Sequence, residues 1–257
     1  MATSQYDLDH IALAAADTTP VLRFLTGPCS ATVLWGGQGI GFRPMQVFVG
    51  TGIEGMKIEL LEPWAAEQND FLERFVARHV HGPHHLTFKV PDLAVAIERF
   101  RGAGFKPVGI DLRDPEWKEC FLLPKEAHGT VVQLAETNGG DFDYLDRSAM
   151  LEAIRRNGAE GNPRWWADPA APDGEPLVLQ HVVIRSPALS SALGFFAGML
   201  HGHIERESAD RVELSWPGGA AIAIEEHLGA LPGVDRLEIA GLDTEVEVLG
   251  TRFAPPR

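Results

Sequence analysis

Two histidines, one glutamate and one glutamine recur in this sequence at nearly the same spacing. His10 stands in DLDHIALAAAD and His85 in GPHHLTFKVPD, two segments that alternate apolar and polar residues as β-strands do. Glu59, in KIELLEP, follows His10 by 49 positions, and Gln133, in TVVQLAE, follows His85 by 48 positions. The four residues therefore occupy equivalent positions in two copies of one unit.

These four side chains form a plausible set of metal ligands. Two imidazoles, one carboxylate and one amide oxygen suit a divalent first-row metal and leave coordination positions for water or substrate. A single strand histidine is more often an ordinary hydrogen-bonded residue, but four such residues with matched spacing favour a site. We expect a metal held by His10, Glu59, His85 and Gln133, and this set does not distinguish Zn, Mn, Co, Ni or Fe.

The segments around these residues predict the elements that position them. Each histidine strand leads into a helix-like stretch, TTPVLRFLTG in the first copy and DLAVAIERFRGAG in the second. Further alternating segments with turn signals follow each helix, so that the unit reads β-α-β-β-β, twice. If the two copies pack with pseudo-two-fold symmetry, the four ligands converge. Successive strand residues face opposite sides, so His84 should point away from the metal.

The C-terminal third repeats the pattern incompletely. A connector rich in Pro, Gly and Trp spans about residues 137–176 and contains a short amphipathic helix. Beyond it, His181 begins a third copy, in which Ala223 stands where Glu59 stood and Arg236 where His85 stood. The last copy is expected to end without a second helix or closing strands. We predict a paired metal-binding domain at 1–138, a helix and linker at 139–175, and a degenerate domain of the same repeat at 176–257.

Composition and charge exclude several classes of partner. The 257 residues carry 36 acidic and 22 basic side chains, a formal charge of −14. This balance argues against nucleic acid and anionic membrane surfaces as partners. There is no apolar run of the roughly 20 residues needed to span a bilayer. Two distant cysteines, Cys29 and Cys120, suggest neither a disulfide framework nor a cysteine zinc site, and a cytoplasmic protein is expected.

The matching segments resemble the vicinal oxygen chelate superfamily, which includes glyoxalase I, methylmalonyl-CoA epimerase, fosfomycin-resistance proteins and extradiol dioxygenases. The resemblance rests on LDHIALAAAD, MKIELLEP, HHLTFKVPDLAVAIERFRGAGF and GTVVQLAE, and covers residues 6 to about 138. It implies an α+β fold in which tandem βαβββ modules form a cupped mixed sheet around the metal. Within this superfamily, the sequence most resembles the methylmalonyl-CoA epimerase and glyoxalase I branch.

The order of ligands departs from that branch. Epimerases typically carry the amide in the first copy and the carboxylate in the second, whereas this chain has Glu59 first and Gln133 last. An amide cannot accept a proton at neutral pH, so Glu59 is the candidate catalytic residue for proton transfer. On the strand before Glu59, only Gln46 stands nearby. Glu62 and Glu136 fall on the opposite faces of their strands and are expected on the surface.

The resemblance implies a metal-dependent enzyme of the isomerase or lyase type. Such an enzyme would stabilise an enolate or oxyanion of a small oxygen-rich or acyl substrate. Two alternatives remain open: a non-haem iron ring-cleaving dioxygenase using His10, His85 and Glu59, and a non-catalytic binding or resistance protein. The expected partner is a small-molecule substrate, and the C-terminal region is expected to stabilise the fold, extend the pocket or form the surface of a homodimer.

Overall fold

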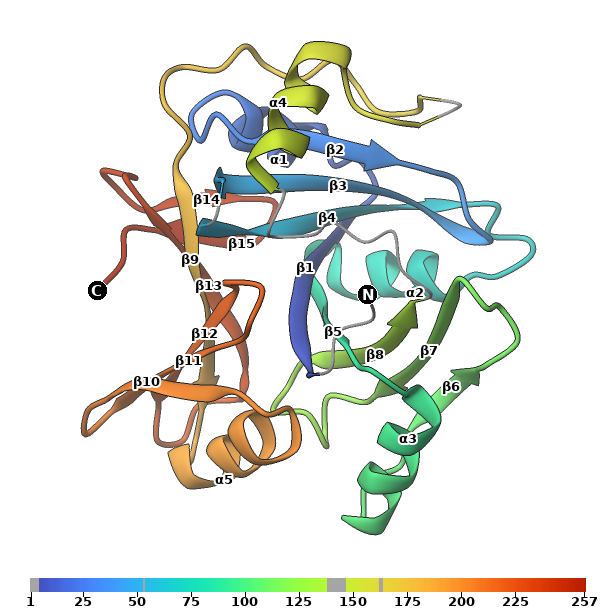
Figure 1. Ribbon diagram of the computed structural model, residues 1–257, viewed down its shortest axis with the longest axis vertical. Coiled ribbons are helices and arrows are strands. Elements are labelled where there is room, and N and C mark those ends of the chain that lie inside the picture. Colours follow the sequence, from blue (N-terminus) through green and yellow to red (C-terminus); the bar gives the residue numbers. More distant parts are fainter. Residues whose placement is uncertain (1–4, 53, 138–146, 162–163) are drawn as a thin grey trace. The chain divides into compact units, whose positions relative to one another are not determined.

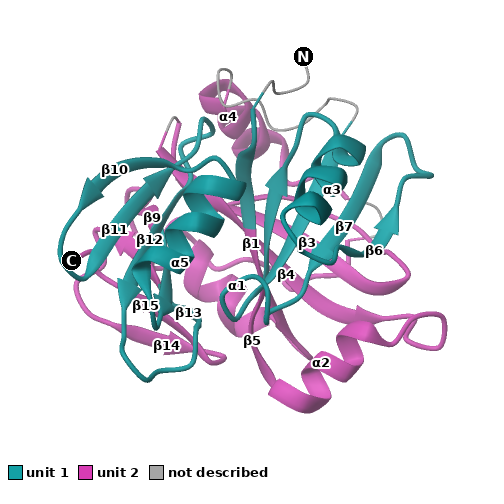
Figure 2. Ribbon diagram, turned by 90° about the horizontal axis from the view of Figure 1, so that it is seen from below, with its two compact units in different colours: residues 1–10, 85–143, 181–236 teal, residues 11–84, 144–180, 237–257 magenta. Residues whose placement is uncertain are grey.

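The computed structural model describes residues 5–52, 54–137, 147–161 and 164–257. They divide into two compact units, each made of three chain segments (Figure 2). The first unit takes in residues 1–10, 85–143 and 181–236, and the second takes in residues 11–84, 144–180 and 237–257. The predicted boundaries after residues 138 and 175 stay a prediction, and residues 138–146 of that linker lie outside the described part of the chain.

The first sheet contains eight strands. They are β1 Asp7–Ala15, β2 Thr32–Gly36, β3 Gly41–Thr51, β4 Glu54–Trp64, β5 His81–Lys89, β6 Val108–Asp111, β7 Trp117–Leu122 and β8 Val131–Thr137. Their order is β2-β3-β4-β1-β5-β8-β7-β6 (Figure 1). β3 and β4 pair antiparallel, whereas β5 and β8 pair parallel, so the sheet is mixed.

The second sheet contains seven strands. They are β9 Val178–Ser186, β10 His203–Glu207, β11 Arg211–Ser215, β12 Ala221–Glu226, β13 Gly233–Ala240, β14 Val246–Val248 and β15 Thr251–Ala254. Their order is β10-β11-β12-β9-β13-β15-β14, again with parallel and antiparallel pairs. The last copy thus has two short closing strands, β14 and β15, where the sequence pattern predicted none. That expectation was wrong because strands of three and four residues are too short to show a clear alternation.

Six helices connect the strands in the described part of the chain. They are α1 Thr19–Thr26, α2 Phe71–His79, α3 Leu93–Gly102, α4 Arg147–Asn157, α5 Leu189–Leu193 and the π-helix η1 Gly194–Met199. Three consecutive modules follow the order β-α-β-β-β: they begin at β1, β5 and β9. The predicted α+β class with tandem βαβββ modules is therefore confirmed.

Helices pack on the sheets through apolar faces. α3 buries Leu93, Ala96, Ile97 and Phe100, which recur at the three- and four-residue spacing of one helix face. In the same unit, Arg99 donates to the carbonyl oxygens of Met199 (3.0 Å) and Gly198 (2.7 Å) in η1. These bonds satisfy carbonyl groups at the end of that helix.

Each of the three complete modules ties the start of its helix to its last strand. A glutamate at the end of that strand accepts a hydrogen bond from a backbone N–H at the helix start. The pairs are Thr18 with Glu62 (2.7 Å), Leu93 with Glu136 (2.8 Å) and Leu189 with Glu226 (3.3 Å). The carboxylate thereby satisfies an N–H group that the helix itself cannot pair.

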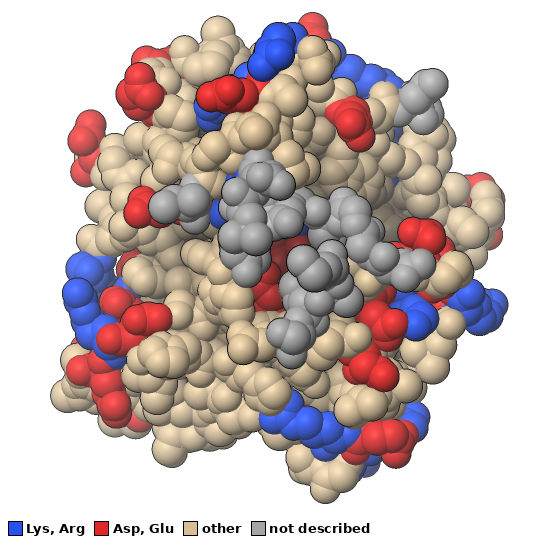
Figure 3. All heavy atoms as spheres, viewed as in Figure 1, with Lys and Arg blue, Asp and Glu red and all other residues tan. Residues whose placement is uncertain are grey.

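Charged side chains of both signs are exposed. On the face drawn in Figure 3, acidic and basic residues are interspersed around the margin. On this face, charges of both signs are therefore in contact with solvent.

Candidate metal centre

The two histidines singled out in the sequence face one another. His10, in the middle of β1, is 1% exposed, and His85, in β5, is 6% exposed. Their ring centroids lie 5.7 Å apart with the ring planes 68° to one another. Two buried imidazoles at this separation can direct ring nitrogens toward a common point.

Glu59 supplies a carboxylate to the same cluster. It lies in β4, where it pairs with Gln46 of β3, and is 9% exposed. The ligand atoms of His10, Glu59 and His85 all lie within 4.8 Å of one another. Among the residues that the structure describes, this is the one group of His, Cys, Asp or Glu side chains with such geometry.

The Thr87 hydroxyl connects Gln133 to His10. Parallel pairing of β5 with β8 places Thr87 opposite Gln133. The Thr87 hydroxyl donates to Gln133 Oε1 over 2.6 Å, and its oxygen lies 2.9 Å from His10 Nε2. Thr87 is fully buried. Because its hydroxyl contacts both Gln133 Oε1 and His10 Nε2, the oxygen end of the Gln133 amide is the end that lies toward His10.

The carboxylate of Asp9 contacts His10 and orients its ring. Asp9 Oδ2 lies 2.7 Å from His10 Nδ1. An ionised carboxylate only accepts hydrogen bonds, so this contact places a proton on Nδ1; Nε2, which lies beside the Thr87 oxygen, is the nitrogen that a bound metal would take. Carboxylates commonly orient metal-binding histidines in this way.

Glu119 contacts the cluster although the sequence analysis did not identify it. It lies in β7, and its Oε2 accepts hydrogen bonds from Gln133 Nε2 (2.7 Å) and from the Trp117 indole (2.9 Å). The alternation of Trp117, Glu119 and Phe121 in WKECFL places all three on one strand face. This alternation is the signal in the sequence from which Glu119 could have been identified.

The donor set fits a divalent metal. Two imidazoles and one carboxylate, with an amide oxygen nearby, match the ligands that first-row divalent ions accept. All four side chains are buried, and the ring nitrogen of His10 is oriented by Asp9. A metal bound by the His10, Glu59 and His85 side chains and by the Gln133 amide would still have coordination positions for substrate oxygens.

Two glutamate positions differ from the expectations. Glu62 was expected on the surface but is 4% exposed, because α1 covers the outer face of β4 and the carboxylate accepts from Thr18 and Arg43. Glu136 is partly buried and bonded to Lys118 and to the start of α3. His84 packs edge-on against Phe75, and burial lowers its pKa to about 4 although Glu59 opposes this shift.

Arg43 lines a cavity of about 310 Å³ in the second unit. Its guanidinium lies 4.6 Å from the Trp165 ring and 5.4 Å from the Trp64 ring, and its Nε donates to Glu62 over 3.0 Å. The glycine-rich segment before it joins β2 to β3, which pair as an antiparallel hairpin.

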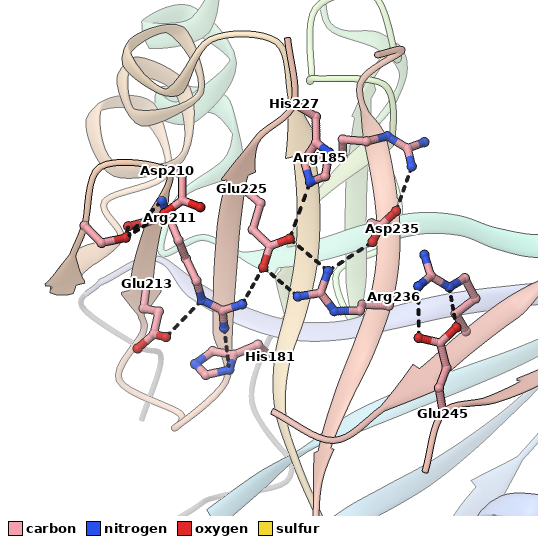
Figure 4. Close-up of polar contacts among 12 residues, drawn as sticks. His181, Arg185, Asp210, Arg211, Glu213, Glu225, His227, Asp235, Arg236 and Glu245 are labelled. Carbon is pink, nitrogen blue, oxygen red and sulfur yellow. Dashed lines mark hydrogen bonds and ion pairs between the residues drawn. The ribbon is translucent and has the colours of Figure 1, made fainter. Parts of the chain in front are cut away.

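The second sheet has an ion cluster in place of a metal-ligand set (Figure 4). Arg236, which aligns with His85, is 4% exposed and donates to both carboxylate oxygens of Glu225, over 2.6 and 2.9 Å. Arg211 donates to the same carboxylate over 2.7 Å and to Glu213 over 3.1 Å. His181, which aligns with His10, has its Nδ1 3.5 Å from Arg211 Nη2. A guanidinium thus supplies the buried positive charge in this sheet.

Several solved structures are similar to this chain or to part of it. A protein from Staphylococcus aureus of unassigned function shares the fold over 98% of this chain and 100% of its own, at 13% identity and a TM-score of 0.61. Methylmalonyl-CoA epimerase from Mycobacterium tuberculosis resembles 54% of this chain over 93% of its own, at 22% identity and a TM-score of 0.45. A methylmalonyl-CoA epimerase crystallised with methylmalonyl-CoA gives 22% identity over 53% of this chain and 97% of its own, with a TM-score of 0.46.

No curated protein sequence matches this chain. None of the described helices is both long and apolar enough to cross a membrane. Residues 9–121, which contain His10, Glu59 and His85, match the family model of the Glyoxalase/Bleomycin resistance protein/Dioxygenase superfamily. This match lies within the first half of the chain and agrees with the resemblance seen in the sequence.

Proposed function

We propose that this chain is a divalent-metal-dependent enzyme of the isomerase or lyase type. The metal ligands in this proposal are His10, Glu59, His85 and Gln133. The observation that carries it is the proximity of three buried ligand atoms, all within 4.8 Å of one another. The match of residues 9–121 to the superfamily model supports the same conclusion.

The chemistry follows from the charges that the site would hold. A divalent metal there would stabilise negative charge on a substrate oxygen, as in an enolate or oxyanion. Gln133 binds through a neutral oxygen and cannot take up a proton, whereas Glu59 can. We therefore assign proton transfer at the substrate to Glu59. We assign to Asp9 and Thr87 the role of orienting the His10 ring.

The substrate class in this proposal is a small oxygen-rich or acyl compound. Substrates of this kind present a carbonyl or carboxylate oxygen to a metal and an acidic proton on the neighbouring carbon. The burial of all four ligands removes competing water and strengthens the interaction with a developing anion.

A second function is favoured by the ligand types. Two histidines and one carboxylate are also the set that non-haem iron oxygenases use. Under this alternative, His10, His85 and Glu59 would hold iron, and activity would be lost when the iron oxidises in air. Retention of activity with zinc, manganese, cobalt or nickel would exclude this alternative.

Metal content tests the proposal first. The protein is purified without added metal or chelator, and plasma mass spectrometry is applied to wild type, His85→Ala and His181→Ala. His181 is a matched control because it aligns with His10 but lies in the second sheet beside Arg211. We expect about one metal per chain in wild type and in His181→Ala, and none in His85→Ala.

Activity is then tested by proton exchange. Acyl and hydroxy-acid compounds are incubated in D₂O with the metal-loaded protein and with Glu59→Gln, and deuterium incorporation is followed by NMR. Exchange in wild type that Glu59→Gln abolishes supports the isomerase or lyase assignment. A wild-type protein that binds no metal even after reconstitution refutes it and leaves the role of a small-molecule binding protein.

A further inference from the structure

We propose that Glu119 positions the amide of Gln133 so that its oxygen, and not its nitrogen, is presented as the fourth metal ligand. This inference rests on the proposed metal-binding function. In this proposal Glu119 does not bind the metal itself. It is a positioning residue, because it acts through Gln133. The argument depends on three hydrogen bonds and on the register of β7, β8 and β5.

The two ends of the Gln133 amide have different partners. Nε2 donates to Glu119 Oε2 over 2.7 Å, and Oε1 accepts from the Thr87 hydroxyl over 2.6 Å. An ionised carboxylate has no proton to donate. If the amide were turned by 180°, its oxygen would face the Glu119 carboxylate and lose a hydrogen bond. The carboxylate therefore selects the orientation in which the oxygen lies on the Thr87 and His10 side.

Strand register brings Glu119 within reach. Antiparallel pairing of β7 with β8 places Phe121 opposite Gln133 and Glu119 opposite Ala135. Glu119 is thus the diagonal neighbour of Gln133 on the same strand face, a separation that a long side chain can bridge. The methyl side chain of Ala135 leaves space for this contact. A longer residue at 135 would stand between the carboxylate and the amide.

The carboxylate is itself oriented by an indole. Trp117 Nε1 donates to Glu119 Oε2 over 2.9 Å, so both donors meet the same oxygen. The Lys89 ammonium lies 4.5 Å from the Trp117 ring centroid and keeps a positive charge beside this chain of contacts. Charge-assisted hydrogen bonds of this kind are stronger than neutral ones. The orientation of Gln133 is therefore set before any metal binds.

Outer partners of this kind commonly change metal affinity by about 10–100-fold when they are removed. Glu119→Leu removes the acceptor and should raise the Kd for cobalt by that factor. Glu119→Gln retains an acceptor oxygen that can meet both donors, so it should restore affinity to within a few-fold of wild type. Gln133→Ala removes the ligand, and adding Glu119→Leu to it should cost less than about twofold more, because the two residues act as one unit.

The experiment measures cobalt affinity by chelator competition and records the visible absorption spectrum of the cobalt-loaded proteins. A second readout needs no metal: the side-chain amide resonances of Gln133, identified by their loss in Gln133→Ala, are compared in wild type and Glu119→Leu. We expect these resonances to shift when the carboxylate is removed. Thermal melting checks that each variant is folded.

Equal cobalt affinity in wild type and Glu119→Leu would overturn the inference while leaving the proposed function intact. Fully additive losses in the double variant would also overturn it, because Glu119 would then act through the fold and not through Gln133. A wild-type protein that binds no cobalt would refute the proposed function instead. In that case unchanged Gln133 amide resonances in Glu119→Leu would refute the positioning role as well.

Discussion

The buried ion cluster of the second sheet allows a quantitative test of how this fold tolerates charge. Glu225 is 3% exposed and accepts three charge-assisted hydrogen bonds, two from Arg236 and one from Arg211. Glu225→Gln removes the negative charge but keeps the shape of the side chain. Two poorly exposed guanidinium groups would then lack their shared counter-charge. Breaking a buried pair in this way costs about 3–5 kcal/mol.

The measurement is urea denaturation followed by circular dichroism. With a slope of about 3 kcal/mol/M, a loss of about 4 kcal/mol lowers the urea midpoint by about 1.3 M. Glu245→Gln is the matched control. Glu245 also accepts two hydrogen bonds from one arginine, Arg252, each 2.9 Å long, but the two side chains are 49% and 39% exposed. The control should cost no more than about 1 kcal/mol.

The two variants share the substitution and the paired hydrogen-bond geometry and differ in burial. If Glu225→Gln were no more destabilising than Glu245→Gln, the reasoning that burial makes this charge cluster costly to break would be refuted. Metal content should be unchanged in both, since neither residue belongs to the cluster of His10, Glu59 and His85.

Three further predictions follow from single side chains. Burial raises the pKa of the Cys29 and Cys120 thiols to about 12, so neither thiol should react with Ellman's reagent at pH 8 until the protein is denatured. Because these pKa values in the folded protein exceed the ordinary value of 9.0, the free energy of unfolding should fall as pH rises above about 9. Asp9→Asn should weaken cobalt binding by about tenfold in a competition titration, because His10 loses the carboxylate that orients it; an unchanged Kd would refute that role. Glu62→Leu should lower the free energy of unfolding by about 3 kcal/mol in urea titrations, and a loss below about 1 kcal/mol would contradict the importance of its buried bonds.

The candidate ligand residues could be singled out in the sequence because the duplicated unit keeps their positions in the strands. A period of two within each strand decided that His85, and not His84, aligns with His10, and the structure brings these two rings together. The spacing also indicated Glu59, whose carboxylate lies with the two imidazoles. Periodicity was sufficient here because the backbone of a strand determines which face each side chain takes.

Other features depended on contacts between strands that periodicity cannot give. The bond from Gln133 to Glu119 requires the β7–β8 register, which joins residues 14 positions apart. Glu62 was expected on the surface because it faces away from the site, but the outer face of β4 is covered by α1 and both faces are buried. Alternation distinguishes the two faces of a strand, and it does not show which of them is covered by a helix.

The glutamates at the helix starts have a consequence for how this protein folds. In each of the three modules, the helix begins soon after the first strand, whereas the glutamate that caps it arrives 37 to 44 residues later, at the end of the module. The first turn of a helix is the unfavourable step of helix formation. Each helix therefore gains its cap only when the final strand of its own module has docked, and we expect helix and final strand to become protected from hydrogen exchange together, as one cooperative step per module.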